Sequence, residues 1–100
     1  MELLQTQNFQ RWLAGLRDLR ARSRVLARIE RLRSGNPGDI KPVRGGLSEL
    51  RIPYGPGYRV YLIRQGETLI VLLAGGDKSS QTRDIGRAIA LAQGLELTEN

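Results

Sequence analysis

The first third of the chain carries apolar residues at the spacing of two amphipathic helices. Thr6 offers a hydroxyl that predicts the start of the first helix, and a short junction over 18–21 leads to a second helix over 21–34. Because the junction is short, the two helices are expected to form an antiparallel hairpin. The predicted inward-facing residues are Phe9, Trp12, Leu13, Leu16 and Leu19 in the first helix and Val25, Ile29 and Leu32 in the second.

After residue 46 the pattern changes to the alternation that is typical of β-strands. Turn-forming residues over 53–57 and 65–67 separate the alternating segments, so the strands that they join are expected to be antiparallel. Residues 68–74 are apolar on both faces, which predicts a strand in the interior of the sheet. Together with a short strand at the N-terminus, the expected strands are residues 2–5, 47–52, 58–64 and 68–74.

Glycine, proline and capping residues define the remaining segments. Residues 35–46 contain four Gly and two Pro, so we expect a loop there and another over 75–78. A last helix is predicted over 80–93, with Ser79 or Ser80 as its N-cap and 94–100 as a flexible tail. The order β-α-α-β-β-β-α predicts one α+β domain over 1–100, in which an antiparallel β-sheet carries an N-terminal α-helical hairpin and a C-terminal helix.

Positive charge is the strongest functional signal in the composition. Sixteen Lys and Arg against ten Asp and Glu leave a net charge of +6, and fourteen of the sixteen are Arg. A guanidinium group matches phosphate through parallel N–H donors, so this balance favours a nucleic acid or the ribosome as partner. The alternative is that the charge serves solubility alone. The second helix carries Arg20, Arg22, Arg24, Arg28, Arg31 and Arg33.

Several kinds of chemistry are excluded by missing residue types. The chain has no cysteine and no histidine, which excludes disulfides, thiolate nucleophiles and the commonest general base. We expect no metal and no cofactor, because no ligand cluster is visible and Gly75-Gly76 lacks the spacing of a phosphate-binding loop. No apolar run approaches the roughly 18 residues of a membrane span. With no signal peptide visible either, the expected location is the cytoplasm, without membrane contact.

Three strings in order resemble the RelE/ParE toxin superfamily, in its HigB-like branch of phage-derived or addiction-module killer proteins. The resemblance covers about residues 3–92 and implies the RelE-like fold. The first string spans the helices, the second the central hairpin and the third the closing loop and helix. They read Phe9-x-x-Trp12-Leu13-x-x-Leu16 with Arg28-Ile29-x-Arg31-Leu32-x-x-Gly35-Asn36-x-Gly38-Asp39, then Glu49-Leu50-Arg51-Ile52-x-Tyr54-Gly55-Pro56-Gly57-Tyr58-Arg59-Val60-Tyr61, then Leu72-Leu73-x-Gly75-Gly76-Asp77-Lys78-Ser79-Ser80-Gln81-x-x-Asp84-Ile85.

The resemblance implies the toxin of a type II toxin–antitoxin pair. Toxins of this branch cleave mRNA, usually on translating ribosomes, and so inhibit translation. Their partner is a small antitoxin, often a helix-turn-helix protein, and operator DNA is bound only through the toxin–antitoxin complex. Two alternatives stay open: a ParE-like toxin that binds and inhibits DNA gyrase, and a non-catalytic nucleic-acid binder.

Candidate catalytic residues follow from the chemistry of RNA cleavage by transphosphorylation. The RNA supplies the 2′-OH nucleophile, so the protein must chiefly orient it and stabilise negative charge on phosphorus. Arg59, which matches the strand arginine of the family, and Arg51 would converge on the phosphate if the turn pairs their strands; the alternative for Arg59 is an ion pair with Glu49 or Asp84. Lys78 is either a phosphate ligand or a solvated loop lysine. Asp84 is either a proton acceptor or a carboxylate that the helix dipole favours.

Further RNA contacts are expected from aromatic and basic side chains. Aromatic rings can stack on bases, and the arginines of the second helix can bind phosphates or form a solvated face that docks an acidic antitoxin. The chain has no tyrosine after Tyr61 and no histidine, so the resemblance assigns neither the general acid nor the general base. The candidate RNA-binding residues are Tyr54, Tyr61, Gln81, Lys41, Arg44, Arg24, Arg28 and Arg31.

Overall fold

The computed structural model describes residues 1–98 as an α+β fold built on one five-stranded sheet. The strands lie in the order β1-β5-β4-β3-β2, and two short 3-10 turns precede β3 and α3. The predicted α+β class is confirmed. The strands are β1 (Glu2–Gln5), β2 (Ile40–Pro42), β3 (Ser48–Ile52), β4 (Tyr58–Gln65) and β5 (Leu69–Asp77), and the helices are α1 (Gln7–Ala14), α2 (Leu19–Arg33) and α3 (Gln81–Thr98).

The sheet is mixed, so the prediction of a purely antiparallel sheet was wrong. β1 pairs with β5 in parallel, with Glu2 opposite Leu69, while the other three pairs are antiparallel. β5 is apolar on both faces and needs a strand on each side. β4 occupies one side, and β1 covers the other before the chain leaves through α1.

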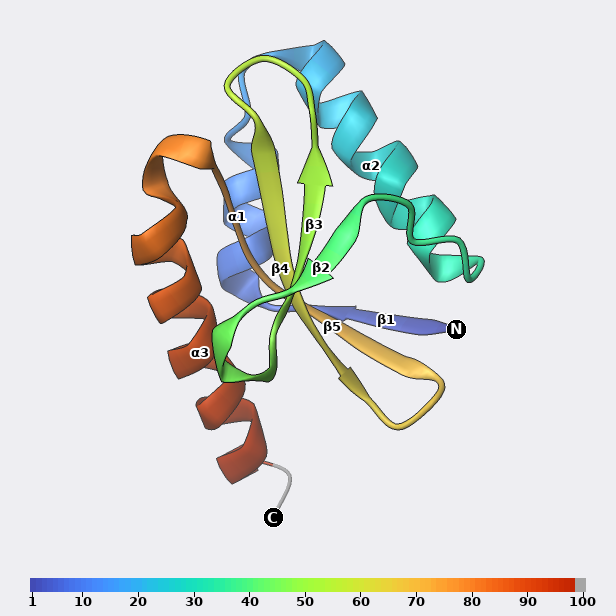
Figure 1. The fold of residues 1–100 in the computed structure, drawn as a ribbon, viewed down its shortest axis with the longest axis vertical. Helices are drawn as coiled ribbons and strands as arrows, with labels where there is room; N and C mark the ends of the chain where they lie inside the picture. The colour runs from blue at the N-terminus through green and yellow to red at the C-terminus, as the bar shows by residue number, and fades with distance from the viewer. Residues whose placement is uncertain (99–100) are drawn as a thin grey trace.

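Helices cover both faces of the sheet (Figure 1). α1 and α2 pack on one face, where Phe9, Val25 and Ile29 meet inward-facing residues of β3, β4 and β5. α3 packs on the other face, over Tyr61 and Leu73. The alternation predicted for β4 is confirmed, because Tyr58, Val60 and Leu62 belong to the first core and Tyr61 and Ile63 to the second.

The first helix is shorter than its apolar spacing predicted. Thr6 is the N-cap, as expected, and accepts a hydrogen bond from the N–H of Phe9, but α1 ends at Ala14. Asp18 then caps α2 by accepting from the N–H groups of Arg20 and Ala21. Leu19 therefore opens α2 with its side chain 68% exposed, and its predicted inward position was wrong.

Two segments that were predicted to be loops contain β-strand residues. Residues 40–42 pair with β3 and form the edge of the sheet, and β5 continues through Gly75 and Gly76 to Asp77. Short edge strands with a proline carry no clear alternation, and glycine is a weak strand former, so neither segment shows a strand pattern in the sequence.

The C-terminal helix begins and ends differently from the prediction. Asp77, rather than Ser79 or Ser80, caps the 3-10 turn that leads into α3. α3 then extends to Thr98, so the predicted flexible tail was wrong for residues 94–98, and residues 99–100 lie outside the described residues. Over the described part of the chain, no helix combines the length and the apolar character needed to cross a membrane.

Candidate functional site

Arg51 and Arg59 lie directly opposite each other on neighbouring strands. The register of β3 and β4 pairs their Cα positions, so both side chains emerge on the face of the sheet that α3 covers. The turn does pair the two strands in register, which was the condition for bringing the two arginines together. On the far side of Arg59 the next residue in the row is Gly76 of β5, and on the far side of Arg51 the chain passes Asp39.

Arg59 is held close to a buried carboxylate. Its Nε lies 3.6 Å from Oε1 of Glu49, and its Nη1 donates to the carbonyl oxygen of Tyr58 at 3.2 Å. Only 12% of the Arg59 side chain is exposed, and Glu49 has no exposed surface. Gln81 donates to the other oxygen of Glu49. The ion pair with Glu49, which the sequence left open as an alternative, is therefore present.

Lys78 stands beside Arg59 at the turn between β3 and β4. A Cβ built on Gly57 would lie 3.5 Å from Nη1 of Arg59 and 3.6 Å from Cβ of Lys78, which places both residues around this glycine. Gly57 has a φ of +83°, a conformation that only glycine adopts without strain. Lys78 is exposed, and within the described residues it forms no ion pair.

Arg51 is paired more loosely than Arg59. Its Nε and Nη2 donate to Oδ1 of Asp39 at 3.2 and 3.0 Å, and the two side chains are 37% and 47% exposed. Exposed ion pairs of this kind contribute roughly 0–1 kcal/mol. A phosphate can therefore replace Asp39 as the partner of Arg51 at little cost.

The segment that leads into α3 adds positive charge next to Lys78. A surface groove there is lined by Lys78, Arg83 and the residues between them. Asp77 accepts from the hydroxyl and the N–H of Ser79, and these bonds lower the pKa of its carboxyl against the opposing effect of burial. Because the N-terminus of a helix also carries partial positive charge, this groove favours an anion.

Asp84 sits inside the protein rather than at the surface. It is 3% exposed, accepts a hydrogen bond from Ser80 Oγ and covers Gly76, where an added Cβ would collide with its Oδ2. This placement favours a structural role for Asp84. The role of Asp84 as a proton acceptor stays a prediction, because its buried carboxylate has little surface with which to reach bound RNA.

Tyr61 lies wholly in the core beneath α3, so its predicted contact with RNA was wrong. A ring with no exposed surface cannot stack on a base. Burial raises the pKa of its hydroxyl, and the carboxylates of Glu49 and Asp84 raise it further, while Arg59 acts in the opposite direction. The Tyr61 hydroxyl, Glu49 Oε1 and Arg59 Nε are buried atoms without a hydrogen-bond partner among the described residues.

We expect Tyr61→Phe to match the wild type in stability at neutral pH and to be more stable than the wild type above pH 10. The Tyr61 hydroxyl has no well-formed hydrogen bond among the described residues, although Glu49 is close enough to act on its pKa, so removing the hydroxyl should change stability by less than about 1 kcal/mol. In the wild type the hydroxyl stays neutral when folded but ionises when unfolded, so its raised pKa contributes stability below about pH 10 that is lost as the pH rises further. Urea unfolding of both proteins at pH 7 and near pH 11 tests this. A parallel loss of stability in the two proteins would contradict it.

The remaining predicted residues divide between the two faces of the sheet. Arg24, Arg28, Arg31 and Tyr54 line a groove on the α2 side, away from the side chains of Arg51 and Arg59. Arg44 reaches toward Gly86 of α3, since an added Cβ there would lie 3.9 Å from Arg44 Nη2. The structure therefore brings Arg59, Arg51, Lys78 and Gln81 together and leaves the α2 arginines as a separate surface.

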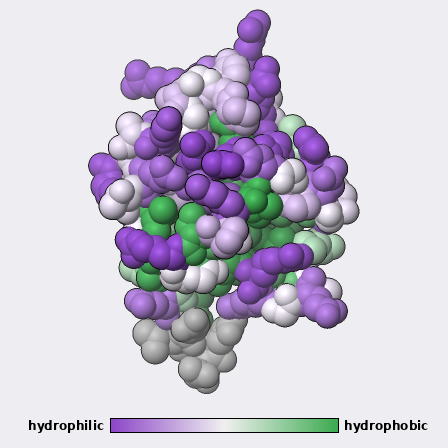
Figure 2. Space-filling view, in the orientation of Figure 1, coloured by the Kyte–Doolittle hydropathy of each residue, from purple (hydrophilic) through white to green (hydrophobic). Residues whose placement is uncertain are grey.

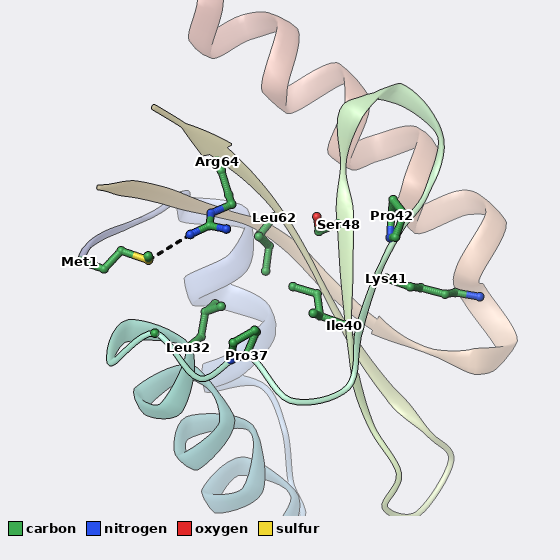
Figure 3. Close-up of a pocket in the computed structure, with 10 residues that line it drawn as sticks. Met1, Leu32, Pro37, Ile40, Lys41, Pro42, Ser48, Leu62 and Arg64 are labelled. Atoms are coloured by element: carbon green, nitrogen blue, oxygen red, sulfur yellow. Dashed lines mark hydrogen bonds between the residues drawn. The ribbon is translucent and has the colours of Figure 1, made fainter. Parts of the chain in front are cut away.

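Lys41 borders an apolar pocket (Figure 3). Leu32, Ile40 and Leu62 form apolar walls, and Arg64 lies opposite with its Nη2 3.8 Å from the sulfur of Met1. In the orientation of Figure 1, hydrophobic side chains are visible in the middle of the molecule and hydrophilic ones surround them (Figure 2). This pocket has no geometric link to Arg59, so Lys41 stays an isolated RNA-binding prediction.

Glu49 and Arg83 are site residues that the sequence did not single out as functional. Glu49 was considered only as a possible partner of Arg59, although it alternates onto the same face as Arg51. That alternation was the available signal. Arg83 has no such signal, because only the path of the chain from β5 into α3 places it in the groove with Lys78.

No family model matches the chain. An uncharacterized protein of Haemophilus influenzae is 52% identical over 97 residues, which span 97% of this chain and 98% of that protein. The chain belongs to the same family as this protein. Identity at this level over nearly the whole of both chains implies that the fold described above is shared within this family.

Proposed function

We propose that this protein is an RNA-binding toxin of a type II toxin–antitoxin pair, which cleaves mRNA on translating ribosomes and so inhibits translation. The observation that carries the proposal is the placement of Arg59 opposite Arg51 and beside Lys78. Arg51 and Arg59 are paired across β3 and β4, and Arg59 and Lys78 both lie beside Gly57 of the β3–β4 turn. A phosphodiester is the ligand that this arrangement fits best.

The proposed reaction needs no metal or cofactor. The 2′-oxygen of the RNA attacks the adjacent phosphorus and the bond to the 5′-oxygen breaks, which leaves a 2′,3′-cyclic phosphate and a 5′-hydroxyl. The proton lost from the 2′-hydroxyl is balanced by the one that the leaving oxygen gains. Arg59 and Lys78 would stabilise the charge that develops on the phosphoryl oxygens, and Glu49 would position Arg59.

The proposal includes a protein partner. A toxin of this kind is expected to be neutralised by a small antitoxin, often a helix-turn-helix protein, and to reach operator DNA only in complex with it. The net charge of +6 suits both an acidic antitoxin and ribosomal RNA. Because it would act on translating ribosomes, we propose the cytoplasm as its location.

A second candidate function is RNA binding without cleavage. It is favoured by the burial of the carboxylates beside the cations, since Glu49 and Asp84 are 0% and 3% exposed. A general base must come within hydrogen-bond reach of the proton that it removes. If neither carboxylate does so, the same surface would hold RNA and block the ribosome without cutting.

Lys78→Ala tests the proposed function with little risk to folding, because Lys78 is exposed and forms no ion pair with the described residues. Wild-type protein added to translating ribosomes should produce discrete cuts in mRNA, mapped by primer extension. We expect Lys78→Ala to lower the cleavage rate about 100-fold, as expected when a charge-stabilising donor is removed. Its thermal unfolding should match the wild type.

Arg87→Ala is the matched control, since it removes one exposed positive charge from α3 outside the groove of Lys78. Its cleavage rate should stay within about twofold of the wild type at physiological salt, where distant surface charges are screened. Intact mRNA with ribosome binding retained would reject cleavage in favour of the second candidate. Equal losses in the two variants would reject the assignment of Lys78.

A further inference from the structure

The groove on the α2 side of the sheet is formed by three arginines and the start of the β3–β4 turn. Arg24, Arg28 and Arg31 are spaced by four and three residues, which places them along one side of α2. Ile52, Pro53 and Tyr54 form the opposite wall. The groove therefore offers guanidinium groups along one wall and apolar and aromatic surface along the other.

None of the three arginines in this groove forms an ion pair among the residues whose side chains are described. Glu30 on the same helix is paired with Arg33, and Asp39 is paired with Arg51. Burial lowers the pKa of Arg28, the charge of Arg31 lowers it further, and Asp39 opposes them. Like charges are thus held close together with only partial compensation from Asp39, and an anionic ligand would supply the rest.

Two of the three arginines are held in place before any ligand binds. Arg28 donates to the carbonyl oxygens of Arg51, Pro37 and Asp39 at 2.5, 3.0 and 3.2 Å. The guanidinium carbon of Arg24 lies 4.6 Å from the centre of the Tyr54 ring, in a cation–π contact. Fixed guanidinium groups lose less side-chain entropy on binding. Because both N–H bonds of Arg28 Nη2 are already used, Arg28 contributes mainly its positive charge, and Arg24 and Arg31 are the donors for a phosphate.

Arg51 links this groove to the candidate cleavage site. Its carbonyl oxygen accepts from Arg28 in the groove, while its side chain lies opposite Arg59 on the other face. Asp39 also contacts both surfaces, because its carbonyl oxygen accepts a hydrogen bond from Arg28 and its carboxylate accepts one from Arg51. The two surfaces therefore meet at one edge of the sheet, in the part of the molecule that carries the β3–β4 turn (Figure 1).

We propose that the groove of Arg24, Arg28, Arg31 and Tyr54 is a second phosphate-binding site, which holds the same single-stranded RNA beyond the phosphate at Arg51, Arg59 and Lys78. This inference rests on the proposed function and adds to it a path for the RNA chain across the protein. The strand crosses the sheet edge at Arg51 and continues along α2. The groove binds and positions the RNA, and it takes no part in bond cleavage.

Binding of 2′-O-methyl RNA tests this path without any contribution from cleavage, because methylation removes the nucleophile. The probes are a trinucleotide and an oligonucleotide of about ten residues, which spans a continuous single-strand site. In Arg24→Gln/Arg31→Gln we expect affinity for the longer probe to fall about tenfold. The slope of log affinity against log salt should become shallower by about 0.7 for each phosphate that the variant no longer neutralises. Affinity for the trinucleotide should stay at the wild-type value.

Arg17→Gln/Arg33→Gln is the matched control. Both residues are exposed, Arg33 is on the same helix, and the charge removed is identical, but neither lines the groove. Equal reductions of affinity in the two double variants would show a general charge effect and overturn the inference, as would unchanged affinity in Arg24→Gln/Arg31→Gln. A protein that binds the longer probe through the groove but leaves mRNA intact would retain the second site and reject the proposed cleavage.

Discussion

Arg59→Ala is expected to reduce RNA cleavage on translating ribosomes by at least about 100-fold, because it removes the guanidinium group that faces Lys78 across Gly57. It should also destabilise the protein. Glu49 has no exposed surface, and loss of Arg59 leaves its carboxylate buried without a cation. Removing one partner of a buried ion pair costs about 3 kcal/mol or more. Primer extension measures the first effect and urea unfolding the second.

The two effects can be separated with Glu49→Gln/Arg59→Gln. This double variant replaces the buried charges by neutral amides, so most of the stability that Arg59→Ala removes should return. Cleavage should not return, because a neutral amide cannot stabilise the developing charge on the phosphate as a guanidinium does. If the double variant cleaves mRNA as the wild type does, Arg59 has no catalytic role. If Arg59→Ala alone stays active, the candidate site is wrong.

Gly75→Ala is expected to lower the free energy of unfolding by about 3 kcal/mol, at the upper end of the usual cost of overpacking. A Cβ at this position would collide with Cε3 and Cδ2 of Trp12. The indole ring is rigid and packs against Phe9 and Tyr58, so it cannot move aside without disturbing the core. Urea or thermal unfolding measures the loss.

Gly94→Ala provides the control for this prediction. Gly94 lies in α3 with no atom within 4 Å of an added Cβ, so alanine should stabilise the protein by about 0.5–1 kcal/mol through its better helix propensity. A double-mutant cycle with Trp12→Leu adds a second check, because a smaller side chain leaves room for the new methyl group. If Gly75→Ala costs as much in the Trp12→Leu background as in the wild type, contact with the indole is not the cause.

The placement of the site residues shows how far local patterns reach. Alternation along 47–52 and 58–64 was enough to predict that Arg51 and Arg59 share a face, because neighbouring positions in a strand point to opposite sides. The loose pairing of Arg51 with Asp39 and the tight pairing of Arg59 with Glu49 were not predictable in the same way. The distances in both pairs depend on how the loop before β2 and the start of α3 pack against the sheet.

The burial of Tyr61 and Asp84 was also not predictable from local sequence patterns. Both were sensible candidates by residue type, and both are buried because α3 lies across the sheet at this point. The apolar face of α3 was visible in the sequence, but the strands that it covers were not. The packing of α3 on these strands is a contact between elements far apart in the chain, so no local sequence pattern predicts it.

Short-range physics therefore accounts for the α+β class, for the N-cap at Thr6 and for the inward residues of β4, since each depends on neighbours within one element. Long-range packing accounts for the parallel pairing of β1 with β5, for the edge strand β2, and for the division of the cations into a site at Arg59 and a groove along α2. These features depend on which distant segments bury their apolar surfaces against one another. That packing is determined by the sequence of the whole chain and not by any single segment.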